Sequence, residues 1–328
     1  MNTATLFSLL MLAFMGAILL LVPQFAPRRY FFAVTVPPGF RTSEAGQAAA
    51  RRYHWWVIRG LAGSAAVVAL LAQTWPNLAF GIAPLLATLS AAAAFLRERS
   101  RLRNYAAPPP GVREADLAPD GDHLPSWILL AVPPFALPLA GAAWLRAHWR
   151  EIPARFPVHW NAAGEPNRWA SKTPVAVYGP LLTAGIVMLL LLLLGLGIFY
   201  GARRAPQRSA ILKILVACVY FLGLMLTGVG LLPLLKIPLA FFIVPVVLLV
   251  AAVVAWGYRI VTDPSFPVET TLDDYWHAGV FYCNPEDPAI FVQKRIGFGY
   301  TFNFGNRLSW LILGAFAAGL VGLALARL

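Results

Sequence analysis

Long apolar segments alternate with polar connections along most of the chain. A helix needs about 18–25 apolar residues to cross a hydrocarbon layer of roughly 30 Å. Eight segments approach this pattern, at residues 4–22, 60–75 (extending back to Trp55), 77–96, 126–145, 175–200, 214–235, 237–257 and 308–326. The pattern therefore predicts an all-α polytopic membrane protein with about eight transmembrane helices.

Short connections and internal prolines refine this prediction. Residues 73–77 separate the second and third segments, and the region of Lys236 separates the sixth from the seventh, so each pair should form a helical hairpin. A proline inside a helix removes an N–H and favours a kink, which neighbouring helices can satisfy. Such prolines are Pro84, Pro133, Pro134, Pro138, Pro180 and Pro245.

Composition places nearly all of the charge outside these segments. Hydrophobic residues make up 59% of the chain, and no Asp, Glu or His lies inside the apolar segments. Ion-coupled pumps and transporters carry ionisable side chains at mid-bilayer depth. The pattern therefore argues against ion coupling and directs the search for function to the loops.

The basic residues predict the orientation. The first segment has no basic region before it and is followed by Arg28 and Arg29, which is typical of a retained helix rather than a cleaved signal. With the N-terminus outside, nineteen of the 26 Lys and Arg residues fall in cytoplasmic loops and seven fall outside. Because cytoplasmic loops are enriched in Lys and Arg, we expect both termini outside.

The net charge of +12 has two readings. Basic loops beside a membrane usually serve topology and contacts with anionic lipids, so we expect membrane lipids, and no nucleic acid, as partners.

Cys218 falls in a helix and Cys283 in a cytoplasmic loop. This leaves no disulfide framework and no cysteine-based zinc site.

Two of the long cytoplasmic loops differ in composition. In 24–54 we expect an extended stretch from Tyr30 to Pro38, followed by a helix with Ser43 as its N-cap. The loop 97–125 is rich first in Arg, then in Pro, then in acidic residues. That composition is typical of a mobile tether.

The third cytoplasmic loop, 259–307, reads as short strands broken by a turn at 284–288, and is the candidate for a small β-rich subdomain. Large residues alternate there with Gly, Thr or Asn, which would place five on one face of a strand: Ile296, Phe298, Tyr300, Phe302 and Phe304. The bare opposite face would admit a backbone or a ligand. The alternative is that the segment packs on the helices or lies in the headgroup layer.

Acidic residues of the same loop also have two interpretations. Asp273, Asp274 and Asp287 could form a cation-binding or acid/base cluster. The alternative, which we favour, is a solvated acidic edge beside Lys294 and Arg295.

The external loop between the fourth and fifth segments gathers polar and ionisable residues. Pro157 fixes the approach of the chain, and residues 161–164 suit a turn, across which His159 and Glu165 would face each other. Such a pair could tune a proton near neutral pH or supply two metal ligands, with His148 or Glu151 as a third. The alternative is a satisfied turn, with His159 bonded to backbone and Lys172 at the head of the fifth helix.

The residues of this loop carry a resemblance. The stretch Ile152-Pro…Pro157-Val-His159-Trp-Asn161…Gly164-Glu165-Pro…Ser171-Lys172 resembles the signature of a bacterial membrane domain of unknown function, number 1648, known from SdpI-like immunity proteins. The SdpI-like proteins, which are one branch of those with this domain, protect a cell from its own secreted membrane-active peptide. The resemblance implies a bacterial inner-membrane protein. Trp160 stands where the family has Phe, and Asn167 where it usually has Asp, which removes a carboxylate from any metal site.

A second resemblance lies in the last cytoplasmic loop. Seven residues match the core of another uncharacterised family, domain of unknown function 5808: Trp276, Gly279, Phe281, Tyr282, Asn284, Pro285 and Asp287. The continuation from Lys294 through Gly299 to Asn303 also fits. Proteins with this longer layout have no settled activity that the resemblance would bring with it.

These observations divide the chain into four regions: 1–125, with three helices; 126–258, the membrane core with the external loop 148–174; 259–307, the β-rich subdomain; and 308–328, the last helix. The candidate binding residues are Pro157, His159, Asn161, Gly164, Glu165 and Lys172 outside, and Tyr282, Asn284, Asp287 and Asn303 inside. No catalytic residue and no cofactor is implied, and metal binding stays open.

Three functions fit this pattern. The favoured one is a non-enzymatic receptor or immunity-type protein, which binds an envelope peptide or protein outside and a regulatory partner inside. The others are a membrane-embedded metal- or lipid-dependent enzyme and an uncoupled transporter component. The Walker, Gly-x-Ser-x-Gly and His-Glu-x-x-His motifs are absent. Small residues from Ala318 to Gly322 would also allow a homodimer.

Overall fold

The computed structural model describes residues 3–72, 74–107, 123–161, 165–201, 205–235, 237–238, 240–263, 268 and 271–325. Eight α-helices lie within these ranges: α1 Thr3–Leu21, α2 Glu44–Leu71, α3 Pro76–Leu102, α4 Ala136–Ala147, α5 Pro174–Gly201, α6 Ala205–Gly230, α7 Ala240–Thr262 and α8 Arg307–Leu325. Within the same ranges, six segments are long and apolar enough to cross a membrane: Glu44–Leu71, Leu78–Tyr105, Ser126–Ala147, Pro174–Gly201, Ser209–Gly230 and Phe241–Thr262. The apolar parts of α1 and α8 are shorter. The chain is thus a mostly α-helical, multi-pass integral membrane protein.

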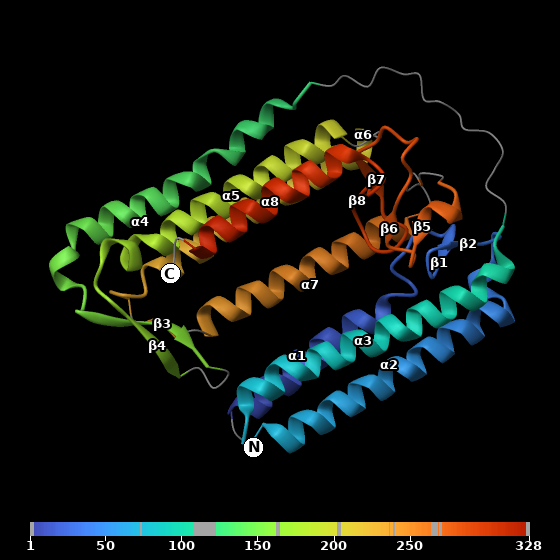
Figure 1. The fold of residues 1–328 in the computed structure, drawn as a ribbon, viewed down its shortest axis with the longest axis horizontal. Coiled ribbons are helices and arrows are strands. Elements are labelled where there is room, and N and C mark those ends of the chain that lie inside the picture. Colours follow the sequence, from blue (N-terminus) through green and yellow to red (C-terminus); the bar gives the residue numbers. More distant parts are fainter. Residues whose placement is uncertain are drawn as a thin grey trace.

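Small two-stranded antiparallel sheets complete the described part of the fold. They pair β1 Tyr30–Phe31 with β2 Val34–Thr35, β3 Arg155–Trp160 with β4 Pro166–Ser171, β5 Trp276–His277 with β6 Phe281–Tyr282, and β7 Phe291–Gln293 with β8 Tyr300–Phe302. Figure 1 shows β1, β2 and β5–β8 at one end of the helices, and β3–β4 with both chain ends at the opposite end. The two loops with candidate binding residues therefore lie at opposite ends of the molecule.

The helices form two groups. Helices α1, α2 and α3 pack on one another, and α4, α5 and α6 form the second group. Helix α7 lies between the groups in Figure 1, apart from α6. The expected hairpin of the sixth and seventh segments is therefore wrong for most of their length. The two helices approach near their connection, where a Cβ on Gly228 would lie 2.8 Å from the Phe242 ring.

The start of α2 and the internal prolines lie where the sequence predicts them. The hydroxyl of Ser43 accepts the N–H of Gly46 at 3.2 Å, which confirms Ser43 as the N-cap of α2. Pro84, Pro180 and Pro245 lie inside α3, α5 and α7.

In the fourth segment, two 3₁₀ turns precede α4, at Ser126–Ala131 and Pro133–Phe135. Pro133 and Pro134 lack the N–H groups that a regular helix would use here.

Helix α3 runs beyond its apolar segment and brings a carboxylate into the packed structure. The apolar pattern predicts Glu98 in the loop 97–125, whereas its side chain is 1% exposed in the last turns of the helix. Its oxygens accept from Arg52 Nη2 at 2.7 Å and from Arg101 Nη1 at 2.6 Å. The loop composition had predicted a tether, but i, i+3 pairing and helix packing order this stretch. The Pro-rich and acidic part of that loop, residues 108–122, lies outside the described residues.

The stretch from Tyr30 to Pro38 is not extended throughout. Phe32 and Ala33 have φ values of 47° and 59°, which turn β1 back onto β2 in a two-residue hairpin. Type I′ hairpin turns need positive φ at both central positions, and usually hold Gly or Asn there. Phe32 and Ala33 are buried and packed in the core of the first helix group, which compensates for the strain.

The alternating stretch 296–304 is not one strand. Gly297 and Gly299 have φ values of 74° and 104°, so the chain turns and only Tyr300–Phe302 pairs as β8. The large residues therefore face different neighbours. Ile296 packs on the first helix group, and Phe298 lies 5.4 Å from the Trp256 ring of α7. The expected single face is wrong, and the alternative of packing on the helices is confirmed.

A second positive-φ hairpin lies against the first. Ala278 and Gly279, between β5 and β6, have φ values of 51° and 78°. A Cβ on Gly279 would lie 2.7 Å from Ala33 Cβ and 3.1 Å from Arg99 Nη1. Only glycine fits this contact, because both the backbone angle and the space exclude a side chain.

Replacing Gly279 with Ala is expected to lower the free energy of unfolding by about 2–4 kcal/mol, from backbone strain plus a steric clash. Gly299→Ala serves as the matched control, because Gly299 has a positive φ but open space around it. It is expected to cost about 1–2 kcal/mol from strain alone. Chemical denaturation in detergent micelles measures both, and equal losses would contradict the close approach.

Candidate functional site

The hairpin β3–β4, in the loop predicted to be external, is built on one buried residue and is otherwise open. Phe156 is buried among Leu145, Ile152, Val177 and Leu181, which belong to or flank α4 and α5. The remaining residues of both strands are half-buried or exposed. Val158 and Trp169 are exposed, the latter by 51%. A two-stranded sheet held at one point leaves its polar backbone edges accessible.

Polar pairs join the two strands of this hairpin. Asn161 accepts the N–H of Glu165 at 2.9 Å, and its amide donates to Glu165 Oε2 at 3.1 Å. His159 Nδ1 lies 2.6 Å from Asn167 Oδ1, so a proton on Nδ1 is donated to the amide oxygen. His159 and Glu165 thus have different partners and are not bonded to each other in these pairs. Gly164 lies outside the described residues.

Two further expected residues flank the hairpin. Pro157 stands opposite Trp169 in the register of β3 and β4. Lys172 lies just before α5, with Nζ 5.2 Å from the centroid of the Trp149 ring. Trp149 in turn stacks on Tyr178, with centroids 5.8 Å apart. Lys172 therefore caps an aromatic pair at the helix end, as expected of a cation at a membrane interface.

The described residues do not bring together the side chains that a metal site needs. Nowhere in the ranges that the structure describes do three His, Cys, Asp or Glu side chains gather as a metal site would require. His148, considered as a third ligand, has Nδ1 2.9 Å from the carbonyl of Trp144. Asn167 occupies the position next to His159 where the resemblance expects a carboxylate.

At the opposite end, the four expected residues do meet. Asn303 is fully buried, and its Oδ1 accepts the N–H of Asn284 and of Gly305, each at 3.0 Å. Its amide donates to the carbonyls of Asn284 and Asp287 at 2.8 and 2.9 Å. Tyr282 donates to Asp287 Oδ2 at 3.0 Å. These contacts hold the turn at 284–288 against β8.

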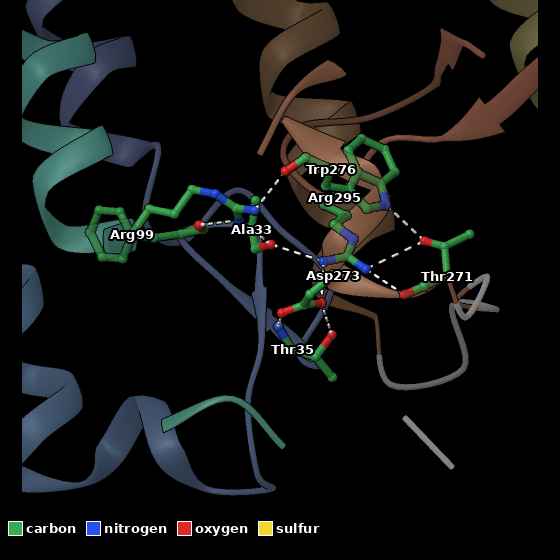
Figure 2. A network of polar contacts seen from close by, with 8 residues as sticks. Ala33, Thr35, Arg99, Thr271, Asp273, Trp276 and Arg295 are labelled. Atoms are coloured by element: carbon green, nitrogen blue, oxygen red, sulfur yellow. Dashed lines mark hydrogen bonds and ion pairs between the residues drawn. The ribbon is translucent and has the colours of Figure 1, made fainter. Parts of the chain in front are cut away.

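The centre of this end is a buried arginine that sequence analysis did not single out. Arg295 is 1% exposed, and its guanidinium donates to Asp273 Oδ1, to the carbonyl of Thr271 and, at 3.0 Å, to the carbonyl of Ala33. The group lies 4.7 Å from the Tyr30 ring centroid and 5.1 Å from that of Trp276. Figure 2 shows this network.

The same network reaches into α3 and the first hairpin. Arg99 donates to the carbonyl of Ala33 at 2.6 Å and to that of Trp276 at 2.9 Å. Thr35 donates its hydroxyl to Asp273 Oδ1 at 2.6 Å and its N–H to Oδ2 at 3.2 Å. Ala33 therefore accepts from two arginines, Arg99 of α3 and Arg295 after β7 (Figure 2).

The predicted acidic edge is only partly correct. Burial raises the pKa of Asp273, but the charge of Arg295 and the hydrogen bonds from Thr35 and Arg295 outweigh it and hold the pKa below its usual value. Because the folded-state pKa is depressed, this carboxylate stabilises the fold above the unfolded-state pKa. That stability is lost as pH falls through the folded-state value. Asp273 and Asp287 are partnered inside the fold, whereas Asp274 belongs to neither pair.

The β-rich end, meaning residues 271–306 with β5–β8, connects the two helix groups. On one side it holds Ala33 and Arg99 through the contacts above. On the other, Phe291 is buried with Ile198 of α5 and Ile211 of α6. A displacement of one helix group relative to the other must therefore pass through these contacts or break them.

Comparisons with protein families find two separate regions of this chain that match known family models. Residues 136–184 match the family model described as a domain of unknown function, DUF1648, and cover α4, the external hairpin and the start of α5. Residues 285–310 match a family of unknown function, DUF5808. The chain carries both expected domains. Neither the curated proteins nor the solved structures that were compared give a match.

The DUF1648 region contains all six of the external candidate residues, Pro157, His159, Asn161, Gly164, Glu165 and Lys172. The DUF5808 region contains Asp287, Arg295 and Asn303, whereas Tyr282 and Asn284 lie just before it. Ala33, Arg99 and Asp273 lie outside both matches. One feature of the sequence could have indicated this network: the charged Arg295 follows closely on a run of aromatic and aliphatic residues. The structure shows that residues of this run are buried.

Proposed function

We propose that this integral membrane protein is a non-enzymatic receptor of the immunity type, which binds an envelope peptide or protein through the hairpin β3–β4. The observation that carries the proposal is the exposure of this hairpin. It combines open strand edges, an exposed Trp169 and Val158, and the cations Arg155 and Arg168. Extended peptides pair with open strand edges, and exposed aromatic and basic side chains are common anchors at binding surfaces.

The orientation and location belong to the same proposal. The Lys/Arg bias supports both termini outside, in the inner membrane of a bacterium. The hairpin then faces the envelope, and the β-rich end faces the cytoplasm, where it would meet a regulatory partner. The immunity subtype comes from the resemblance of the external loop to SdpI-like proteins.

A second copy of the chain is a further proposed partner. A Cβ added at Gly314, Gly319 or Gly322 of α8 would meet no atom within 4 Å. This face of α8 is therefore open to another helix, and small residues allow two helices to approach closely.

The experiment is purification of the full-length protein from native membranes in mild detergent, wild type beside His159→Ala, with mass spectrometry of all co-eluting components, metals included. We expect a peptide or protein that is lost in His159→Ala, because that change removes the bond to Asn167 at the hairpin. His123→Ala is the matched control, an exposed histidine outside the DUF1648 region, and should retain the ligand.

The other outcomes decide between the remaining functions. A stoichiometric metal or lipid that depends on His159 would move the assignment to the membrane-embedded enzyme. A ligand retained in both variants, together with unchanged resistance of the cells to envelope-active peptides, would overturn the receptor proposal. Flux into proteoliposomes above that of empty vesicles would identify an uncoupled transporter.

A further inference from the structure

A second polar site lies at the end opposite the external hairpin, where α1 and α2 approach each other. A cavity of about 350 Å³ is lined there by Gln24, Arg41, Gln47, Arg51 and His54, together with Phe31 and other apolar residues. Pro23 and Gln24 follow the end of α1, and Arg51 and His54 lie in the first turns of α2. The cavity thus lies beside the end of α1 and just before the apolar part of α2.

Arg41 is fixed at the wall of this cavity. Its Nη2 donates to the carbonyls of Ala26 and Pro27 at 2.9 and 2.8 Å, and also to that of Tyr30. Its Nε is buried and has no hydrogen-bond partner among the described residues. Burial lowers the pKa of Arg41 to about 10, so the group stays charged at neutral pH. A ligand in the cavity would meet the guanidinium of Arg41 where this side chain lines the wall.

The cavity lacks a carboxylate. The residues that line it within the described ranges include two arginines and a histidine, but no Asp or Glu. Elsewhere at this end the chain supplies its own anions, Glu98 for Arg52 and Asp273 for Arg295. Arg28 adds a further positive charge close to Arg41. No lining carboxylate therefore compensates the positive charges of this cavity, and an anion from outside the chain would do so.

We propose that this cavity binds a phosphate-bearing anion, with Arg41 and Arg51 as the charged contacts and Gln24 as a neutral donor. The oxygen of Gln24 accepts from Tyr258 at 3.5 Å, so its N–H groups are the part available to a ligand. Phosphate suits two guanidinium groups, which donate paired hydrogen bonds to its oxygens. The phosphate belongs to an anionic lipid headgroup or to a soluble phosphate compound. This site is independent of the external hairpin.

The test uses the full-length protein in detergent and measures binding by native mass spectrometry and by thermal stabilisation. The probes are phosphatidylglycerol, phosphatidylcholine and inorganic phosphate. Arg51→Gln and Gln47→Glu alter exposed residues of the cavity, one by removing a cation and one by adding an anion. Each is expected to weaken anion binding about tenfold, the effect of one charge-assisted hydrogen bond.

Arg59→Gln is the matched control. It removes the same charge from the same helix outside the cavity, where Arg59 lies 3.7 Å from the Trp55 ring centroid, and binding should equal that of wild type. Binding of phosphatidylglycerol alone identifies a lipid headgroup, and binding of inorganic phosphate with the same variant pattern identifies a soluble phosphate. Equal weakening by Arg59→Gln, equal binding of phosphatidylcholine, or no binding of either anion would overturn the proposal.

Discussion

Replacing Arg295 with Met is expected to lower the free energy of unfolding by about 3–5 kcal/mol, the cost of breaking one partner of a buried ion pair. The change leaves the Asp273 carboxylate without its cation, and removes a donor from the carbonyls of Ala33 and Thr271. It also removes one of the contacts between the β-rich end and the first helix group, whereas those of Arg99 and Thr35 remain. Chemical denaturation in detergent micelles measures the loss.

Lys294→Met is the matched control, because it removes the same charge from the neighbouring residue, whose side chain is exposed. Its effect should stay within about 0.5 kcal/mol. In Arg295→Met, the additional change Asp273→Asn should recover part of the loss, since it removes the uncompensated charge. A single variant as stable as wild type would show that Arg295 does not hold the two parts together.

Asn303→Leu is expected to cost about 4 kcal/mol or more, because each buried polar group left without a partner costs roughly 1–3 kcal/mol. The change unpairs the N–H groups of Asn284 and Gly305 and the carbonyl of Asp287, whereas the carbonyl of Asn284 keeps the N–H of Asp287 at 3.3 Å. Leu has the same number of side-chain heavy atoms but larger methyl groups, so no cavity forms and the loss reports the hydrogen bonds together with the cost of overpacking. The same denaturation experiment measures it.

Asn104→Leu provides the comparison for this variant. Asn104 is exposed at the end of α3, and the identical substitution there should change stability by no more than about 0.5 kcal/mol. Comparable losses at both positions would contradict the interpretation of Asn303 as the centre of the turn. A folded Asn303→Leu protein that only loses a ligand bound at this end would instead assign the residue to binding.

Together the two variants test how the helix groups are joined. Arg295 joins the β-rich end to the β1–β2 hairpin, whereas Asn303 orders the turn within the β-rich end itself. Loss of the first contact should leave the DUF1648 region folded, because Phe156 packs only against residues of its own group. Loss of the second should also disturb Phe291, whose strand pairs with β8 next to Asn303.

The sequence by itself determined the features that depend on local pattern. The eight apolar segments became helices, Ser43 became an N-cap, and both families of unknown function were named correctly. The motif used for DUF1648 lies inside its match, whereas most of the core motif used for DUF5808 lies just before its match. The placement of the external loop and the β-rich loop at opposite ends also followed from counting segments. These properties need only segment length, hydropathy and short-range hydrogen bonds, which the sequence displays directly.

Tertiary structure alone decided which polar groups meet. Arg295 and Ala33 are 262 positions apart, and no periodicity indicates that one donates to the other. The hairpin at Phe32 and Ala33 uses positive φ at residues that normally avoid it, so only the buried contacts around it select that conformation. The glycines near 297 likewise served as turns rather than as the bare face of a strand. Partner choice depends on packing between distant segments, and the order of residues along the chain does not encode it locally.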